Sequence, residues 1–143
     1  MNKAFHELAG FIFGDNEAVD GSGSVKIPMT SPVITEMLSE RSFLISFVMP
    51  SHYTLDTLPK PNNPLVRIIQ VAPQEMAAVE WKGAVPDQKL VDKKEGEMQE
   101  ILHHSQYYSE GNPYLFEYDP PFTPSWMRNN EVLYKVRKIE HSE

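Results

Sequence analysis

The sequence lacks cysteine, an excess of positive charge and any apolar run long enough to cross a membrane. Without cysteine there are no disulfides, no thiolate nucleophile and no thiolate ligand for a metal. A net charge of −7 argues against nucleic acid or an anionic membrane surface as a partner. The N-terminus shows no signal-peptide pattern. We therefore expect a soluble, cytoplasmic protein that binds neither nucleic acid nor a membrane.

The composition of the chain is that of a globular protein. Hydrophobic residues make up 41% of the 143 residues and charged residues 23%. A chain of this length can bury a sizeable core, and it is typically one domain. We predict a single domain over residues 1–143.

Residues 3–13 show the spacing of a short amphipathic helix. Apolar side chains recur at i, i+3, i+4 and i+7 on one face, at Phe5, Leu8, Ala9 and Ile12. The other face presents Lys3, His6, Gly10 and Phe13. A histidine beside a glycine and a phenylalanine suits a ligand surface, although a solvated histidine on an exposed helix face is the simpler interpretation of His6.

Alternating apolar residues predict several strands after this helix. We expect an edge strand over 25–33, a strong strand over 43–49, a hairpin of 66–71 with 75–81, and later strands over 114–118 and 130–138. A second helix is predicted from Pro86 and Asp87 to about Gln106, with Leu90, Val91, Met98, Ile101 and Leu102 as its apolar stripe.

The segment over residues 118–132 combines three prolines with two large aromatic side chains. Proline fixes φ and lacks the backbone N–H, so residues 120–124 fit neither a helix interior nor a central strand. We predict a stiff, extended loop that carries Phe122, Trp126 and Arg128. Such a loop could hold a flat apolar ligand, or its aromatic side chains could simply cover the end of the core.

The order of the predicted elements indicates an internal repeat. The second half contains strand, strand, helix, strand, strand, and the first half matches it if its leading strands are missing. We therefore predict an α+β fold in which duplicated strand-helix-strand units form a curved antiparallel sheet with two helices packed on it. The missing strands would leave an unpaired sheet edge, through which a second copy could form a homodimer.

Four segments, in order and nearly end to end, resemble the SOUL haem-binding protein family. They are residues 4–16 (AFHELAGFIFGDN), 26–33 (KIPMTSPV), 47–50 (FVMP), and 118–124 (YDPPFTP) followed by 128–132 (RNNEV). The family's usual strands before the first helix, which contain the axial histidine proposed for some members, have no counterpart here. That histidine therefore cannot be transferred to this chain.

The resemblance implies a distorted β-barrel with two helices and a shallow apolar groove that binds haem or another tetrapyrrole. Transferred to this chain, the groove lies between the helix over 3–13 and the loop over 119–128. Its expected ligand-binding residues are Lys3, His6, Gly10, Phe13, Phe122, Trp126 and Arg128. His6 would be the axial ligand if the iron is ligated, and Lys3 or Arg128 would bind the propionates.

Two other function classes remain open from the residues alone. A gyrase-inhibitor-like enzyme that hydrolyses a small molecule would need a base among His6, Glu7 and Glu131, with Tyr118 or Tyr134 to orient a water. The sequence has no Ser-His-Asp motif and no His-Glu-x-x-His motif. We therefore expect a binding protein and not an enzyme. An interaction module that recruits a partner strand to the sheet edge is the third class.

Overall fold

The computed structural model describes residues 2–39, 42–83, 88–120 and 122–140. Within these residues it has two helices and seven strands in antiparallel sheets, which confirms the predicted α+β class. The chain divides into two compact units. Unit 1 comprises Met1–Ser31 and Ile45–Ala72, and unit 2 comprises Pro32–Leu44 and Pro73–Glu143.

Unit 1 is built around helix α1 (Asn2–Phe13). Its core consists of Phe11 and Ile12 packed with Ile27 and Val66. The predicted apolar face is confirmed for Ile12, which is buried. Phe11 is also buried, although it was not predicted to lie on that face. The helix ends where Asp15 N donates to Gly10 O at 2.8 Å and Gly14 takes a φ of 127°, a conformation that favours glycine.

The buried Asn16 side chain connects three parts of unit 1. Its Nδ2 donates to Phe11 O at 2.6 Å and to Val25 O at 2.8 Å, and its Oδ1 accepts from Val25 N at 2.9 Å. Asn16 also begins the two-residue strand β1 (Asn16–Glu17), which pairs with β4 (Lys60–Pro61). The segment that follows α1 is therefore anchored at its start.

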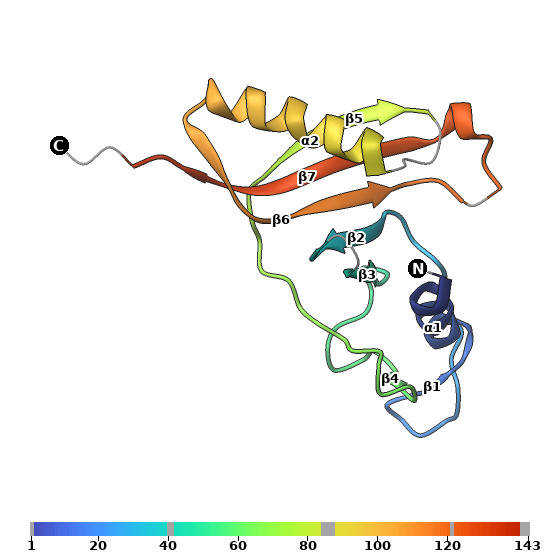
Figure 1. Cartoon of the computed structure of the whole chain (residues 1–143). Helices are drawn as coiled ribbons and strands as arrows, with labels where there is room; N and C mark the ends of the chain where they lie inside the picture. The colour runs from blue at the N-terminus through green and yellow to red at the C-terminus, as the bar shows by residue number, and fades with distance from the viewer. Residues whose placement is uncertain (1, 40–41, 84–87, 121, 141–143) are drawn as a thin grey trace. The chain divides into compact units, whose positions relative to one another are not determined.

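Unit 2 contains most of the five-stranded sheet, which has the order β3-β2-β6-β7-β5. The strands are β2 (Val33–Met37), β3 (Phe43–Phe47), β5 (Met76–Lys82), β6 (Tyr107–Glu117) and β7 (Asn129–Lys138). The order is open, with β3 and β5 at its ends, so the described strands form a sheet and not a closed barrel. Figure 1 shows β5, β6 and β7 running side by side.

Helix α2 (Gln88–His103) packs on β5, β6 and β7 in unit 2 (Figure 1). The apolar stripe is confirmed at Val91, Met98 and Leu102, which lie in two buried clusters with side chains of the sheet. The prediction was wrong for Ile101, which is 59% exposed, because it lies on the edge of the stripe that turns away from the sheet. The predicted helix start at Pro86 and Asp87 lies outside the described residues.

Two predicted strands are absent from the described structure. Residues 66–71 form no strand, so the predicted hairpin is wrong, and β5 pairs with β7 instead. Val66 and Ile68 instead pack against the core of unit 1, while Ile69 and Val71 are exposed. Residues 25–32 also form no strand, since Ile27 N donates to Ile12 O at the end of α1. Valine and isoleucine favour strands, but a strand also needs a partner for its backbone.

Candidate functional site

Helix α1 presents the first set of predicted ligand-binding residues. Lys3 and His6 are exposed, and Phe13 is 66% exposed. They remain on the surface because Phe11 and Ile12 occupy the opposite side of the helix in the core. An added Cβ at Gly10 would meet only Asp15 Cβ, at the ordinary contact distance of 3.9 Å. Packing therefore does not require glycine at position 10.

The loop between β6 and β7 presents the second set. Its ends are joined because Asp119 accepts hydrogen bonds from the backbone and side-chain amides of Asn129. Thr123 N donates to Pro120 O at 3.0 Å, and the 3₁₀ helix η1 (Ser125–Met127) follows. The predicted absence of α-helix and central strand is confirmed for the described residues of this loop. The predicted extended course is wrong, because a turn and a 3₁₀ helix fold the loop back on itself.

The aromatic side chains of this loop are largely exposed. Phe122 is 86% exposed and Trp126 is 73% exposed, and neither belongs to a buried cluster of unit 2. Because large exposed apolar side chains are costly in water, two of them on one braced loop indicate a binding surface more than a cover for the core.

Arg128 helps to hold the shape of the loop. Its Nε donates to Thr123 O at 3.1 Å across the loop. Burial raises the pKa of the Glu117 carboxyl, and the positive charge of Arg128 opposes that shift. The structure therefore gives Arg128 a structural contact within unit 2, alongside its predicted role toward a ligand carboxylate.

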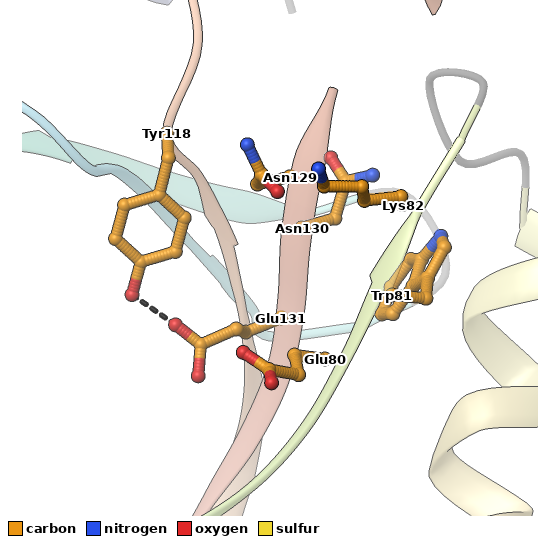
Figure 2. A pocket seen from close by; sticks show the side chains of 7 residues that line it. All are labelled: Glu80, Trp81, Lys82, Tyr118, Asn129, Asn130 and Glu131. Atoms are coloured by element: carbon orange, nitrogen blue, oxygen red, sulfur yellow. Dashed lines mark hydrogen bonds between the residues drawn. The ribbon is translucent and has the colours of Figure 1, made fainter. Parts of the chain in front are cut away.

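A cavity of about 660 Å³ lies at the end of β5 and β7, next to this loop. Seven residues line it, all from unit 2: Glu80, Trp81, Lys82, Tyr118, Asn129, Asn130 and Glu131. Figure 2 shows the Tyr118 hydroxyl pointing at the Glu131 carboxylate, to which it donates a hydrogen bond. Glu80 lies directly opposite Glu131 in the pairing of β5 with β7.

The environment of Tyr118 keeps its hydroxyl protonated. Burial raises the pKa of Tyr118 to about 12, and the hydrogen bond to Glu131 and the negative charges of Glu131 and Glu80 act in the same direction. At neutral pH the phenol is thus a hydrogen-bond donor and not a base. The acceptor in this hydrogen bond is the Glu131 carboxylate.

The structure brings together some predicted residues and separates others. Tyr118 and Glu131, both named as candidate catalytic groups, form one hydrogen-bonded pair. Tyr134 instead packs with Met98 and Leu102 under α2, and burial raises its pKa. The residues of α1 belong to unit 1 and those of the loop to unit 2, so each side of the predicted groove is described by itself.

Sequence reasoning did not single out Glu80, Trp81 or Asn130. The predicted strand over 75–81 contains Glu80 and Trp81, but only the register of β5 against β7 sets Asn130 opposite Trp81 and Glu131 opposite Glu80. Register depends on pairing between distant segments, so no local pattern could have revealed these neighbours.

The described residues contain no group of three or more His, Asp or Glu side chains placed to hold a metal ion. His103 and His104 are exposed at the end of α2, and His104 Nε2 lies 3.2 Å from Glu100 Oε1. In the part of the chain that the structure describes, no helix has the length and apolar character needed to cross a membrane.

The fold is that of an α+β protein that exposes large aromatic side chains on α1 and on the loop between β6 and β7. Comparison with protein families matches residues 1–135 to the family described as SOUL heme-binding protein. The match covers nearly the whole chain, and the protein belongs to the SOUL haem-binding family. Comparison with curated proteins finds no match. The family is defined by haem binding and not by a catalytic activity, so it supports a tetrapyrrole as the ligand class.

Proposed function

We propose that the protein holds a porphyrin between α1 and the loop over residues 119–128. The observation that carries this proposal is the exposure of Phe13, Phe122 and Trp126 on the two predicted walls. The residues fit the ligand, since a porphyrin offers an extended apolar plane for stacking and two carboxylates for cations. Lys3 is exposed on α1 and would bind one carboxylate.

The apolar rings would provide most of the affinity. Covering about 100 Å² of one ring contributes about 2.5 kcal/mol at 25 cal/mol per Å², before the entropic cost of association. When haem is bound, its iron supplies a coordination position. The exposed imidazole of His6 is the group that we propose as the axial ligand. A groove that contacts only the flat porphyrin ring, without ligating the iron, would bind metal-free porphyrin as tightly as haem.

Absorbance titrations with haemin and with protoporphyrin IX test this proposal. We expect saturable binding of both by the wild type, with Phe122→Ala and Trp126→Ala each weakening it about tenfold to a hundredfold through lost stacking area. Leu55→Ala, at an exposed apolar position outside the two predicted walls, is the control and should bind normally. Absence of saturable binding by the wild type would overturn the proposal.

His6→Ala separates the two modes of binding. If His6 ligates the iron, the haemin spectrum should shift and its affinity should fall, while protoporphyrin IX binding stays the same. Equal titrations of wild type and His6→Ala with both ligands would remove the axial role of His6 and keep the groove.

A small-molecule hydrolase is the second candidate function, and the Tyr118–Glu131 pair beside a cavity favours it. Glu131 would accept a proton from water, and the Tyr118 hydroxyl would orient it. Turnover of p-nitrophenyl acetate, lost in Glu131→Gln and retained in Glu7→Gln, would support this function. If Glu131→Gln turns over p-nitrophenyl acetate as fast as the wild type, the hydrolase function is excluded for this site.

We also propose that a second copy pairs at a free edge of the sheet. β5 is an end strand of the described sheet order, so one side of its backbone has no strand partner there. Sedimentation at increasing protein concentration tests this proposal: a dimer that is lost in Ala78→Pro, which removes a backbone donor on the side of β5 that faces away from β7, would support it. A monomer at all concentrations would contradict it.

A further inference from the structure

Two buried hydrogen-bond donors on the cavity wall have no acceptor. Trp81 Nε1 and Asn130 Nδ2 are shielded from solvent and make no hydrogen bond with the residues that the structure describes. The Asn130 side chain is only 2% exposed. Buried polar groups in native proteins are nearly always satisfied, so a pair of unsatisfied donors indicates that something else supplies the acceptor.

The two donors lie next to each other in the sheet. Trp81 on β5 is the register partner of Asn130 on β7, which places both side chains on the same face with Cβ atoms about 4.5–5.5 Å apart. Both residues line the same cavity. Two neighbouring N–H groups suit a single oxygen acceptor, such as a carbonyl oxygen, which has two lone pairs.

The charges around the cavity determine which kind of ligand can bring that oxygen. The next register pair along the two strands is Glu80 with Glu131. Both carboxylates line the cavity together with one cation, Lys82. Like charges directly opposite each other are unfavourable, and neither carboxylate forms an ion pair with a described residue. An anionic ligand is therefore disfavoured and a positive group is favoured. The ring of Tyr118 adds a face suited to a cation.

Side chains from both faces of the sheet reach this cavity. Successive residues of a strand point to opposite faces, so Trp81 and Asn130 approach from one face and Glu80 and Glu131 from the other. Lys82 and Asn129, the last register pair, line the cavity at the end of the two strands (Figure 2). Residues of both sets therefore line one cavity.

We propose that this cavity binds a small organic cation that carries a carbonyl oxygen. The oxygen accepts from Trp81 Nε1 and Asn130 Nδ2, and the cationic group lies toward Glu80 and Glu131. The residues that make these contacts are not among those proposed to bind the porphyrin.

Three probes separate the two halves of this proposal. Acetylcholine has both a cation and a carbonyl oxygen, 3,3-dimethylbutyl acetate replaces its nitrogen by neutral carbon, and tetramethylammonium has no acceptor. Binding is followed through the indole N–H signal of Trp81 by NMR in a Trp126→Phe background, which leaves one tryptophan of the two in the chain. We expect acetylcholine to bind about tenfold more tightly than its neutral analogue.

Variants test each contact, and the exposed Glu80 can be changed without disturbing the core. Glu80→Gln should reduce acetylcholine affinity severalfold, while Glu140→Gln, an exposed carboxylate beyond β7, should leave it unchanged. Trp81→Phe keeps a ring and removes the donor. This variant should bind acetylcholine severalfold more weakly and tetramethylammonium with unchanged affinity. Binding to it is followed through the NMR signals of the backbone amides of β7.

Several results would overturn the proposal. They are the absence of saturable binding of acetylcholine, equal affinity for the neutral analogue, or the same loss in Glu80→Gln and Glu140→Gln. If Trp81→Phe weakens acetylcholine and tetramethylammonium alike, the carbonyl contact is excluded. Asn130→Asp, which replaces the donor with an acceptor, gives an independent check on the same contact.

Discussion

Unit 2 satisfies its backbone through long strand pairing, whereas unit 1 depends on a helix and on single side chains. In unit 2, β7 pairs along its length with β5 and β6, and α2 packs on the three strands. In unit 1, the strands that lie wholly inside the unit are β1 and β4, of two residues each. At the end of α1, Phe11 O accepts a hydrogen bond from the Asn16 side chain, whereas Gly10 O and Ile12 O accept from the backbone N–H groups of Asp15 and Ile27. The cohesion of unit 1 is thus concentrated in few groups.

Matched core truncations give the largest effects and test whether the two units are separate in stability. Met98 in unit 2 and Ile12 in unit 1 are each 1% exposed. Met98→Ala and Ile12→Ala should each lower the free energy of unfolding by about 2–5 kcal/mol. Hydrogen exchange should show faster opening in unit 2 for the first variant and in unit 1 for the second. Identical exchange profiles for the two variants would mean one cooperative unit.

Removal of the Asn16 side chain should have a smaller effect, confined to unit 1. Asn16→Ala leaves the Val25 N–H and the Phe11 and Val25 carbonyls without this partner, which costs about 1–3 kcal/mol for buried groups. Thermal unfolding measures the loss, and exchange at residues 11–27 locates it. Asn62→Ala, at an exposed side chain, is the control and should be near neutral. A loss in Asn16→Ala that appears equally in β6 and β7 would contradict this localisation.

The smallest effect is expected at Glu117 and depends on pH. Burial raises the pKa of this carboxyl above its ordinary value of 4.5, so the folded state binds its proton more tightly than the unfolded state. Stability therefore falls as pH rises from about 4.5 through the folded pKa, because the ionised form is penalised only in the folded protein.

Glu117→Gln removes that penalty. At pH 7 it should raise the free energy of unfolding slightly, by roughly 0.5 kcal/mol or less, and with it the melting temperature. Below the unfolded-state pKa of this carboxyl, the variant and the wild type should be equally stable. Melting curves of wild type and variant across this pH range provide the measurement. Glu110→Gln, at an exposed residue paired with Arg137, serves as the control. A variant that is less stable at pH 7 would show that the Glu117 charge is held favourably, by Arg128 for example.

The sequence by itself determined the elements whose cause is local. Apolar spacing located α1, α2 and four of the strands to within a few residues, because periodicity reports which side chains can share a buried face. The exception is the start of β6, which begins earlier than predicted. The prolines excluded α-helix and central strand from the loop that presents Phe122 and Trp126, and the motifs identified the family.

Tertiary structure alone decided the features that depend on partners distant in sequence. Residues 66–71 have the composition of a strand, yet β7 is the partner of β5 and they form no strand. The same register sets Trp81 beside Asn130 and Glu80 beside Glu131, in a cavity whose two buried donors and two carboxylates have, among the described residues, no acceptor and no ion pair respectively. Backbone hydrogen bonds between remote strands fix such neighbours, and no local side-chain pattern encodes which strand will be the partner.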